Sequence, residues 1–272
     1  MTLKSIQFTA CAICLALFAA TPAFAQDKED AAALSKKTNN PIASLISVPI
    51  EYNKDTDIGP DKTGEQESIK FSPVIPFEIS DDWNMISRTI FSYVDQDIPE
   101  FGIDESGWSD IALTLYFTPK ETGPSGVIWG VGPIFLLDTA TEDSLGAGKW
   151  GLGPAAVALK QEGAWTVGGL TYYLREVDGD DDREDVEQAF LQPFVSYQMA
   201  NGKTSFTLQS EITRDLEKEE TGAFALFQVN QLFSVGSQIL QGRIGVRHWY
   251  ERAEFGPDST ELNLRLTFLF PQ

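Results

Sequence analysis

Apolar and polar residues alternate along most of this chain, and the alternation is clearest at its end. The closing stretch STELNLRLTFLFPQ puts large apolar residues on one parity, at Leu262, Leu264, Leu266, Phe268 and Phe270. A period of two residues predicts a strand with one apolar and one polar face. We expect twelve strands in all, at approximately 43-53, 66-79, 83-95, 107-118, 126-138, 150-161, 163-175, 186-199, 203-214, 221-234, 237-250 and 259-270.

The connections between these strands alternate in length. Long connections such as NKDTDIGPDKTGEQE and EVDGDDDREDVE take the odd places, and tight ones such as SDD, EG and ANG take most of the even places. A bacterial outer-membrane barrel has an even number of strands, short periplasmic turns and longer external loops. The pattern predicts an all-β, transmembrane, antiparallel up-and-down β-barrel of about 12 strands. We expect both termini in the periplasm, an apolar exterior and a hydrophilic interior.

The distribution of charge separates this prediction from its alternative, a secreted soluble β protein. The six long connections, 53-67, 95-107, 138-149, 175-187, 214-220 and 251-261, hold 29 Asp and Glu against 8 Lys and Arg, and the whole chain carries a formal net charge of −20. The remaining chain is therefore almost neutral. A soluble acidic protein has no physical reason to confine its excess charge to alternate connections, whereas a barrel exposes those connections together.

The tryptophans give a further test of the barrel. Three of them begin strands after short turns, and three lie beside long connections: Trp83, Trp129 and Trp165, then Trp108, Trp150 and Trp249. Two aromatic girdles, one at each membrane interface, need this arrangement. The alternative is the general preference of aromatic residues for strand ends.

Six prolines fall inside the predicted strands, at Pro49, Pro73, Pro76, Pro133, Pro154 and Pro193. Proline has no backbone N–H to complete a ladder, and a closed barrel offers no edge where the loss would be harmless. We therefore expect β-bulges beside these prolines.

The first residues have the features of an export signal. Lys4 precedes the apolar segment ACAICLALFAA, and Ala23-Phe24-Ala25 has the small-x-small pattern of a cleavage site. We predict a signal peptide over 1-25, a periplasmic lead or plug over 26-42, and the barrel over 43-272. Both cysteines of the chain fall inside the predicted signal peptide, so the mature chain offers no thiolate or disulfide.

Several phrases together resemble a known family. They are LSKKTNNPIASLISVPI, PVIPFEISDDWNMISRTI, WGVGPIFLLDTATEDSLGAGKWGLGPAAVALKQEGAWTVGGL, FLQPFVSY and LRLTFLFPQ. The chain resembles the outer-membrane transporters associated by name with the meta-pathway of phenol degradation, over almost all of the mature chain. The resemblance implies an outer-membrane barrel akin to channels for hydrophobic substrates. It carries no agreed set of functional residues. The chain ends Phe-Pro-Gln rather than on an aromatic residue, so Phe270 would be the aromatic that assembly machinery recognises.

The predicted inward faces gather polar residues on neighbouring strands. We predict a lumen-lining set of Arg243, Arg247, Arg265, Glu211, Gln209 and Asn263. The arginines could attract anions or bind a carboxylate in a bidentate way. The alternative is a structural network across a narrow lumen, because small barrels are filled by their own side chains.

Two other candidates are weaker. The acidic run VDGDDDREDVE could hold a divalent cation through Asp178, Asp180 and Asp182, but Arg183 occupies the place of the glycine that a calcium loop needs. We favour a solvated loop and expect no metal and no cofactor. His248 is the single histidine, and no motif of a hydrolase surrounds it, so we expect no enzyme.

The sequence thus predicts a channel in the outer membrane of a Gram-negative bacterium for passive passage of small, hydrophobic or aromatic solutes. The alternative is a structural or surface-interaction barrel that acts through its acidic external loops. The expected partners are the lipid bilayer, lipopolysaccharide, a small-molecule solute and the outer-membrane assembly machinery. We expect no nucleic acid.

Overall fold

The structure is a computed structural model that describes residues 28–254 and 256–271. The predicted signal peptide, residues 1-25, lies outside the described residues. The described chain consists of one helix, two short 3-10 turns and one antiparallel sheet. The helix α2 spans Lys28–Thr38, and the 3-10 turns η2 and η3 span Pro99–Phe101 and Asp143–Leu145.

Fourteen strands form the sheet, and it closes on itself where β14 pairs with β1. Every strand pair is antiparallel, for example Glu51 with Arg265 across the closing seam. The strands are β1 (Ile46–Ile58), β2 (Gly64–Phe71), β3 (Val74–Glu78), β4 (Trp83–Ile98), β5 (Ile103–Trp108), β6 (Ile111–Pro119), β7 (Val127–Leu137), β8 (Lys149–Glu162), β9 (Trp165–Gly179), β10 (Glu187–Gln198), β11 (Thr204–Asp215), β12 (Glu220–Val235), β13 (Gln238–Glu251) and β14 (Thr260–Phe270).

These fourteen strands make twelve passes along the barrel, because two passes are interrupted. The second pass is β2 followed by β3, with Ser72 and Pro73 between them, and the fourth is β5 followed by β6, with Ser109 and Asp110 between them. The predicted fold class and the twelve predicted strands are confirmed. The structure extends β1 to Ile58 and β4 to Ile98, beyond the predicted ends.

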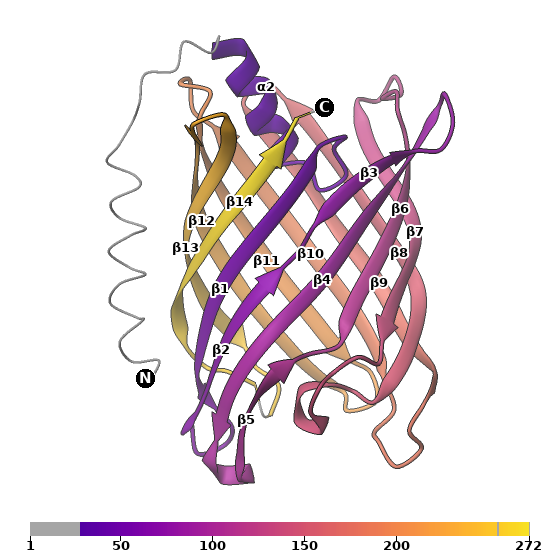
Figure 1. The fold of residues 1–272 in the computed structure, drawn as a ribbon, viewed down its shortest axis with the longest axis vertical. Helices are drawn as coiled ribbons and strands as arrows, with labels where there is room; N and C mark the ends of the chain where they lie inside the picture. The colour runs from indigo at the N-terminus through magenta and orange to yellow at the C-terminus, as the bar shows by residue number, and fades with distance from the viewer. Residues whose placement is uncertain (1–27, 255, 272) are drawn as a thin grey trace.

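The two ends of the barrel differ (Figure 1). Helix α2 and the C-terminus lie together at one end, which we call the helix end. The connections predicted to be short lie at the helix end, and those predicted to be long lie at the opposite end, the loop end, although strands β1, β2 and β12 take up much of their predicted length. Among the helices that the structure describes, none has the length and apolar character needed to cross a membrane.

The outward face is apolar, as the alternation predicted. Leu262 and Phe270 on β14 are 46% and 43% exposed, whereas Asn263, which has the opposite parity, is 1% exposed. Strand β11 behaves in the same way, with Leu208 exposed and Thr207 buried. The opening parity assignment is therefore correct.

The prolines are accommodated without the expected bulges. Pro133 and Pro154 face each other across β7 and β8, and the pairing of β6 with β7 and of β8 with β9 is interrupted beside them. The register is the same on both sides of each gap, and so it is beside Pro193. The prediction of bulges was wrong because a residue's N–H and C=O both point toward one neighbouring strand, so a proline there can leave a local gap without an extra residue.

The interior is hydrophilic on one side only. A cluster of buried apolar side chains from β4 and β6 to β9 fills the other side: Ile86, Tyr116, Ile134, Ala155, Val157, Leu159, Leu170 and Leu174. The predicted hydrophilic interior is therefore found on one side of the lumen and not on the other. These strands carry apolar residues on both faces, which is the pattern of a strand with two apolar environments, and Figure 1 shows their passes side by side.

Candidate functional site

The hydrophilic side of the lumen begins with a row of charges across neighbouring strands. Glu51 on β1 faces Lys70 on β2 and Arg265 on β14, and Arg265 in turn faces Arg243 on β13. Arg265 forms an ion pair and a hydrogen bond with Glu51. The Arg243 Nε donates to Asn230 Oδ1 at 2.7 Å. Cross-strand neighbours of this kind are set by the register alone.

A second group of polar contacts lies closer to the loop end. Arg247 Nη2 lies 2.5 Å from Asp55 Oδ1, and both side chains are buried. The same carboxylate oxygen accepts a hydrogen bond from the indole Nε1 of Trp249 at 3.1 Å. The guanidinium of Arg247 also lies over the rings of Phe224 and Trp249. The buried guanidinium of Arg247 is thus stabilised by the opposite charge of Asp55 and by two aromatic faces.

The remaining predicted lumen residues bond within the barrel wall. Asn263 Nδ2 donates to Asn53 Oδ1 at 2.7 Å, and both are buried. Glu211 Oε1 accepts from the amides of Gln209 and Gln192, at 3.0 and 3.1 Å. The three predicted arginines each have a hydrogen-bond partner inside the protein. Arg247 is also buried, which favours a structural role for it.

A cavity of about 330 Å³ separates the hydrophilic and apolar sides of the lumen. Four of the six predicted residues line it, namely Gln209, Glu211, Arg243 and Arg265, whereas Arg247 and Asn263 do not. Its other side is made by apolar side chains of β4, β9 and β10: Ile90, Leu170, Tyr172, Phe190 and Phe194. The rings of Tyr172 and Phe190 are stacked, with centroids 4.7 Å apart and planes 10° apart.

The segment between α2 and β1 enters the lumen and lines the same cavity from Asn39 to Leu45. Ile42 is 3% exposed and packs in the apolar cluster. Ala43 and Leu45 pack against Leu232 and Leu269. Because this segment contacts both the apolar side and the β12–β14 side, it crosses the lumen at the helix end.

Three glutamines hold α2 and the start of this segment. Gln161 and Gln198 donate to the main-chain oxygens of Lys36 and Ala32, at 2.9 and 3.2 Å. Gln241 donates to Thr38 Oγ1 at 2.7 Å. The three glutamines come from β8, β10 and β13, so the helix is attached to well-separated parts of the barrel wall.

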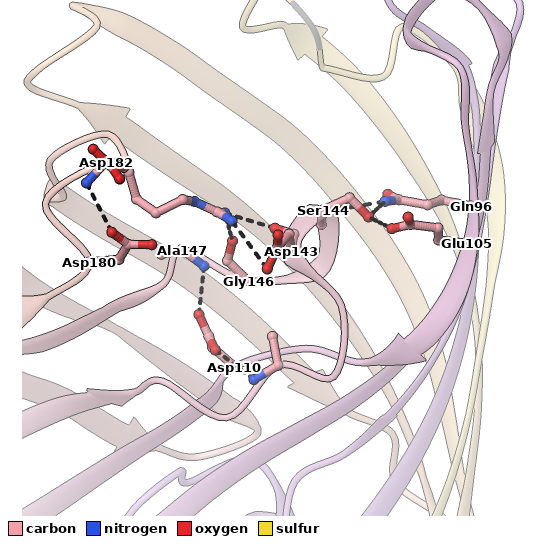
Figure 2. Close-up of polar contacts among 11 residues, drawn as sticks. Gln96, Glu105, Asp110, Asp143, Ser144, Gly146, Ala147, Asp180 and Asp182 are labelled. Atoms are coloured by element: carbon pink, nitrogen blue, oxygen red, sulfur yellow. Dashed lines mark hydrogen bonds and ion pairs between the residues drawn. The ribbon is translucent and has the colours of Figure 1, made fainter.

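The connection between β7 and β8, residues 138–148, lies at the loop end, and we call it the mouth loop. Figure 2 shows Ser144 of this loop beside Gln96 and Glu105. Gln96 Nε2 lies 3.0 Å from Ser144 Oγ, which donates to Glu105. Gln96 is a buried residue of β4, so the mouth loop contacts the inner face of the barrel.

Asp110 fixes the base of the mouth loop (Figure 2). Its Oδ1 accepts the N–H groups of Thr139 and Ala140, both at 2.9 Å, and its Oδ2 accepts that of Ala147 at 2.7 Å. Asp110 lies in the interruption between β5 and β6. Its carboxylate satisfies three loop N–H groups that have no partner in the strand ladder.

Arg183 from the next long connection joins the mouth loop. Its Nη2 donates to the main-chain oxygens of Asp143 and Gly146, at 2.7 and 2.5 Å. Arg183, which stands where a calcium loop needs glycine, thus binds the main chain of the mouth loop instead. The two connections form one network across the loop end.

Two of the three weak metal candidates accept hydrogen bonds from main-chain N–H groups close to them in sequence. Asp178 Oδ1 accepts Gly179 N–H, and Asp180 Oδ1 accepts Asp182 N–H, both at 2.9 Å (Figure 2 for the latter). Across the described residues, no group of three or more His, Cys, Asp or Glu could hold a metal ion. His248 Nδ1 lies 2.8 Å from Thr260 Oγ1, a threonine hydroxyl rather than a serine.

Sequence reasoning missed Arg88, Lys70, Tyr172 and Phe190, which all line the cavity. The segment WNMISRTIFSYV contains Arg88 between Ser87 and Thr89 and has no clear period. Tyr172 is adjacent to a second tyrosine, Tyr173. The signal available for Arg88 was its parity, which it shares with Ile86 and Ile90.

The closed barrel and its apolar outer face define the class of protein. In lipid every backbone group must be bonded internally, and among β structures only closed barrels achieve this. A continuous ring of pairing with exposed Leu, Val, Phe and Trp side chains meets this requirement. The protein is an outer-membrane β-barrel of the kind found in Gram-negative bacteria.

Solved structures agree with this fold. The COG4313 outer membrane channel from Pseudomonas putida F1 is similar with a TM-score of 0.66 and 17% identity, covering 84% of this chain and 97% of that one. The NanC porin (0.49, 11% identity) and the β domain of the Bordetella autotransporter BrkA (0.45, 8%) each cover 84% of this chain and 100% of theirs. The TM-scores of the second and third structures are below 0.5, so the comparison of folds rests on the first structure.

Comparisons of sequence show no family. No family model matches the chain, so the resemblance to transporters of the phenol meta-pathway stays a prediction. A segment of 88 residues is 33% identical to human Protein sel-1 homolog 2, covering 32% of this chain and 13% of that protein. A match to so small a part of a protein carries no function.

Proposed function

We propose that this protein is an outer-membrane channel for the passive passage of small hydrophobic or aromatic solutes. The apolar side of the lumen carries the proposal. Leu170, Phe190 and Phe194 line the cavity, where a porin for polar solutes has a polar interior. Apolar lining lowers the free energy of a hydrophobic solute inside the barrel.

Other observations are consistent with this function. The similar structure from Pseudomonas putida F1 is described as a channel, and the resemblance of the sequence adds phenolic compounds to the candidate solutes. In this proposal the helix end faces the periplasm and the acidic long connections face outward. The segment Asn39–Leu45 and the mouth loop would then narrow the path at its two ends.

Uptake by cells tests the proposal. Cells that lack the protein and carry it on a plasmid should take up labelled aromatic solutes faster than cells without it. Leu170→Gln should reduce this uptake about tenfold, because it places an amide against an apolar solute at a cost of roughly 1–3 kcal/mol. Thr267→Ala, which alters the hydrophilic side of the same cavity, should leave uptake unchanged.

The alternative function is a structural or surface barrel without transport. The occupied lumen at the helix end is the observation that favours it. Reconstitution into liposomes separates the two functions. A barrel that passes no solute, in both the wild type and a variant lacking residues 28–41, would rule out the channel.

A further inference from the structure

We propose that the lumen cavity binds small organic anions, with the anionic group on Arg88 and an apolar or aromatic body on the opposite wall. This inference names the ligand class of the proposed channel and rests on that function. It begins from the charges around the cavity. Its lining includes five basic residues, Lys37, Lys70, Arg88, Arg243 and Arg265, and two acidic ones, Glu51 and Glu211. The cavity is therefore positive in a chain whose formal net charge is −20.

The acidic residues do not neutralise Arg88. Glu51 is paired with Arg265 and also accepts a hydrogen bond from Asn53. Glu211 accepts two amide hydrogen bonds from Gln192 and Gln209. Within the described chain, the side chain of Arg88 has neither a hydrogen bond nor an ion pair.

An arginine in this situation is a binding group for an oxyanion. Arg88 is only partly exposed, in a lumen lined by protein on every side. Its guanidinium presents donors in a planar fork that matches a carboxylate. Low local dielectric strengthens a charged contact and penalises a charge left without one. A neutral apolar solute in the cavity would leave this charge unsatisfied.

An apolar platform for the rest of the ligand lies next to Arg88. Arg88 is close enough to Tyr116 and Tyr172 for its charge to act on both hydroxyl groups. The Tyr172 ring is stacked on Phe190, and its hydroxyl donates to Gln188 Oε1 at 2.9 Å. A planar ring could lie against this pair while its carboxylate reaches the guanidinium.

The size of the cavity limits the ligand. A volume of about 330 Å³ is at the lower end for ligand pockets. It suits a single aromatic ring or a short alkyl chain with one charged group. The geometry therefore selects small monoanionic amphiphiles over sugars or long-chain lipids.

The acidic connections do not prevent anion binding in the cavity. Arg88 precedes Asp95 by seven residues on the same strand, a separation of roughly 23 Å at about 3.3 Å per residue. The Debye length is about 10 Å at 0.1 M salt. Salt therefore screens the loop charges from the cavity, whereas the basic lining acts at contact distance.

Direct binding tests the inference with benzoate and its neutral analogue benzamide. The full mature protein in detergent micelles is titrated with each, by calorimetry or equilibrium dialysis. We expect benzoate to bind more tightly than benzamide. Arg88→Met should raise the Kd of benzoate about tenfold or more, as expected for a charged hydrogen bond, and should leave benzamide unchanged. Arg175→Met, on the exposed face of β9, should change neither.

Arg88→Lys provides a second variant if Arg88→Met fails to fold. It keeps the charge and loses the planar fork, so the Kd of benzoate should rise by a smaller factor. Equal affinity of the wild type for benzoate and benzamide would overturn the inference. An unchanged Kd of benzoate in folded Arg88→Met or Arg88→Lys would also overturn it.

Uptake of neutral benzyl alcohol distinguishes this inference from the proposed function. Protein-dependent uptake of benzyl alcohol without preferential benzoate binding would overturn the anion site and leave the channel. Preferential benzoate binding that needs Arg88, with no transport of any solute, would support the site and overturn the channel.

Discussion

At the scale of single residues, the ion pair of Glu51 and Arg265 shows how charged side chains are stabilised in the lumen. The Glu51 side chain is 9% exposed and that of Arg265 is 24% exposed. Desolvating both charges is costly, and the pair is stable only because each satisfies the other. The row Lys70, Glu51, Arg265 and Arg243 follows from the register of four neighbouring strands.

Glu51→Gln should destabilise the barrel by about 3 kcal/mol, because it leaves the partly buried Arg265 beside Arg243 without its opposite charge. The double variant Glu51→Gln, Arg265→Met should be more stable than Glu51→Gln alone, since the unpaired charge is gone. Urea unfolding in detergent micelles measures both. A double variant as unstable as the sum of the two single changes would show that the pair is not coupled.

Lys62 and Asp258 give a pH-dependent contact between two long connections. Lys62 Nζ lies 2.5 Å from Asp258 Oδ2. This hydrogen bond, and then the charge of Lys62, holds the pKa of Asp258 below its usual value. A carboxyl with a lowered folded pKa contributes stability above its unfolded pKa, and the contribution is lost as the pH falls through the folded pKa.

Lys62→Met should therefore raise the pKa of Asp258 toward the ordinary value for aspartate. Titration of the Asp258 carboxyl carbon by NMR in micelles measures this shift. Lys218→Met, in a different connection, is the matched control and should leave the Asp258 titration unchanged. An unaltered titration in Lys62→Met would mean that the contact does not persist in solution.

At the scale of elements, α2 depends on three glutamine contacts with the barrel wall. An 11-residue helix is marginal in water without tertiary contacts. The triple variant Gln161→Ala, Gln198→Ala, Gln241→Ala should increase amide exchange in α2 by roughly 10- to 100-fold, at about 0.5–1.5 kcal/mol for each bond. Exchange in the barrel strands should be unchanged. Wild-type exchange rates in α2 of the variant would show that apolar packing alone holds the helix.

The mouth loop is a second element whose position depends on one side chain. Asp110→Ala removes the acceptor of three loop N–H groups. We expect amide exchange at Thr139, Ala140 and Ala147 to increase roughly tenfold or more. Asp110→Asn retains one acceptor oxygen and should have an intermediate effect. Protection that survives Asp110→Ala would assign the fixing of the loop to Arg183 and Ser144 instead.

At the scale of the whole molecule, the barrel places apolar side chains on both its outer surface and half of its lumen. The outer surface includes Trp165, Val167 and Leu208, each more than half exposed. The mature chain should therefore require detergent or lipid to fold and stay dispersed. Sedimentation with and without micelles, together with circular dichroism, measures this. A folded monomer in detergent-free buffer would contradict the transmembrane assignment.

The sequence by itself determined the number of passes, their order and which face of most strands points outward. The two-residue period in β11, β13 and β14 fixes side-chain direction, because successive residues of a strand point to opposite faces. Loop length and charge identified the two ends of the barrel. These are local properties, so they can be read along the chain.

The apolar side of the lumen was not predictable in the same way. Where Val157 and Ala158 are both apolar, the period does not say which faces lipid. The proline sites were also misjudged, since the loss of a ladder bond depends on which neighbouring strand the proline faces. Both questions concern what lies opposite a residue, and only the closed barrel answers them.

Only the tertiary structure decided how the candidate site is composed. Arg243 and Arg265 were predicted to face the lumen, but their partners Asn230 and Glu51 come from other strands. Arg88 stands apart because no acceptor from the described chain reaches it. A sequence specifies which side chains face inward, whereas closure and the entry of Asn39–Leu45 decide which of them meet a partner and which remain available to a ligand.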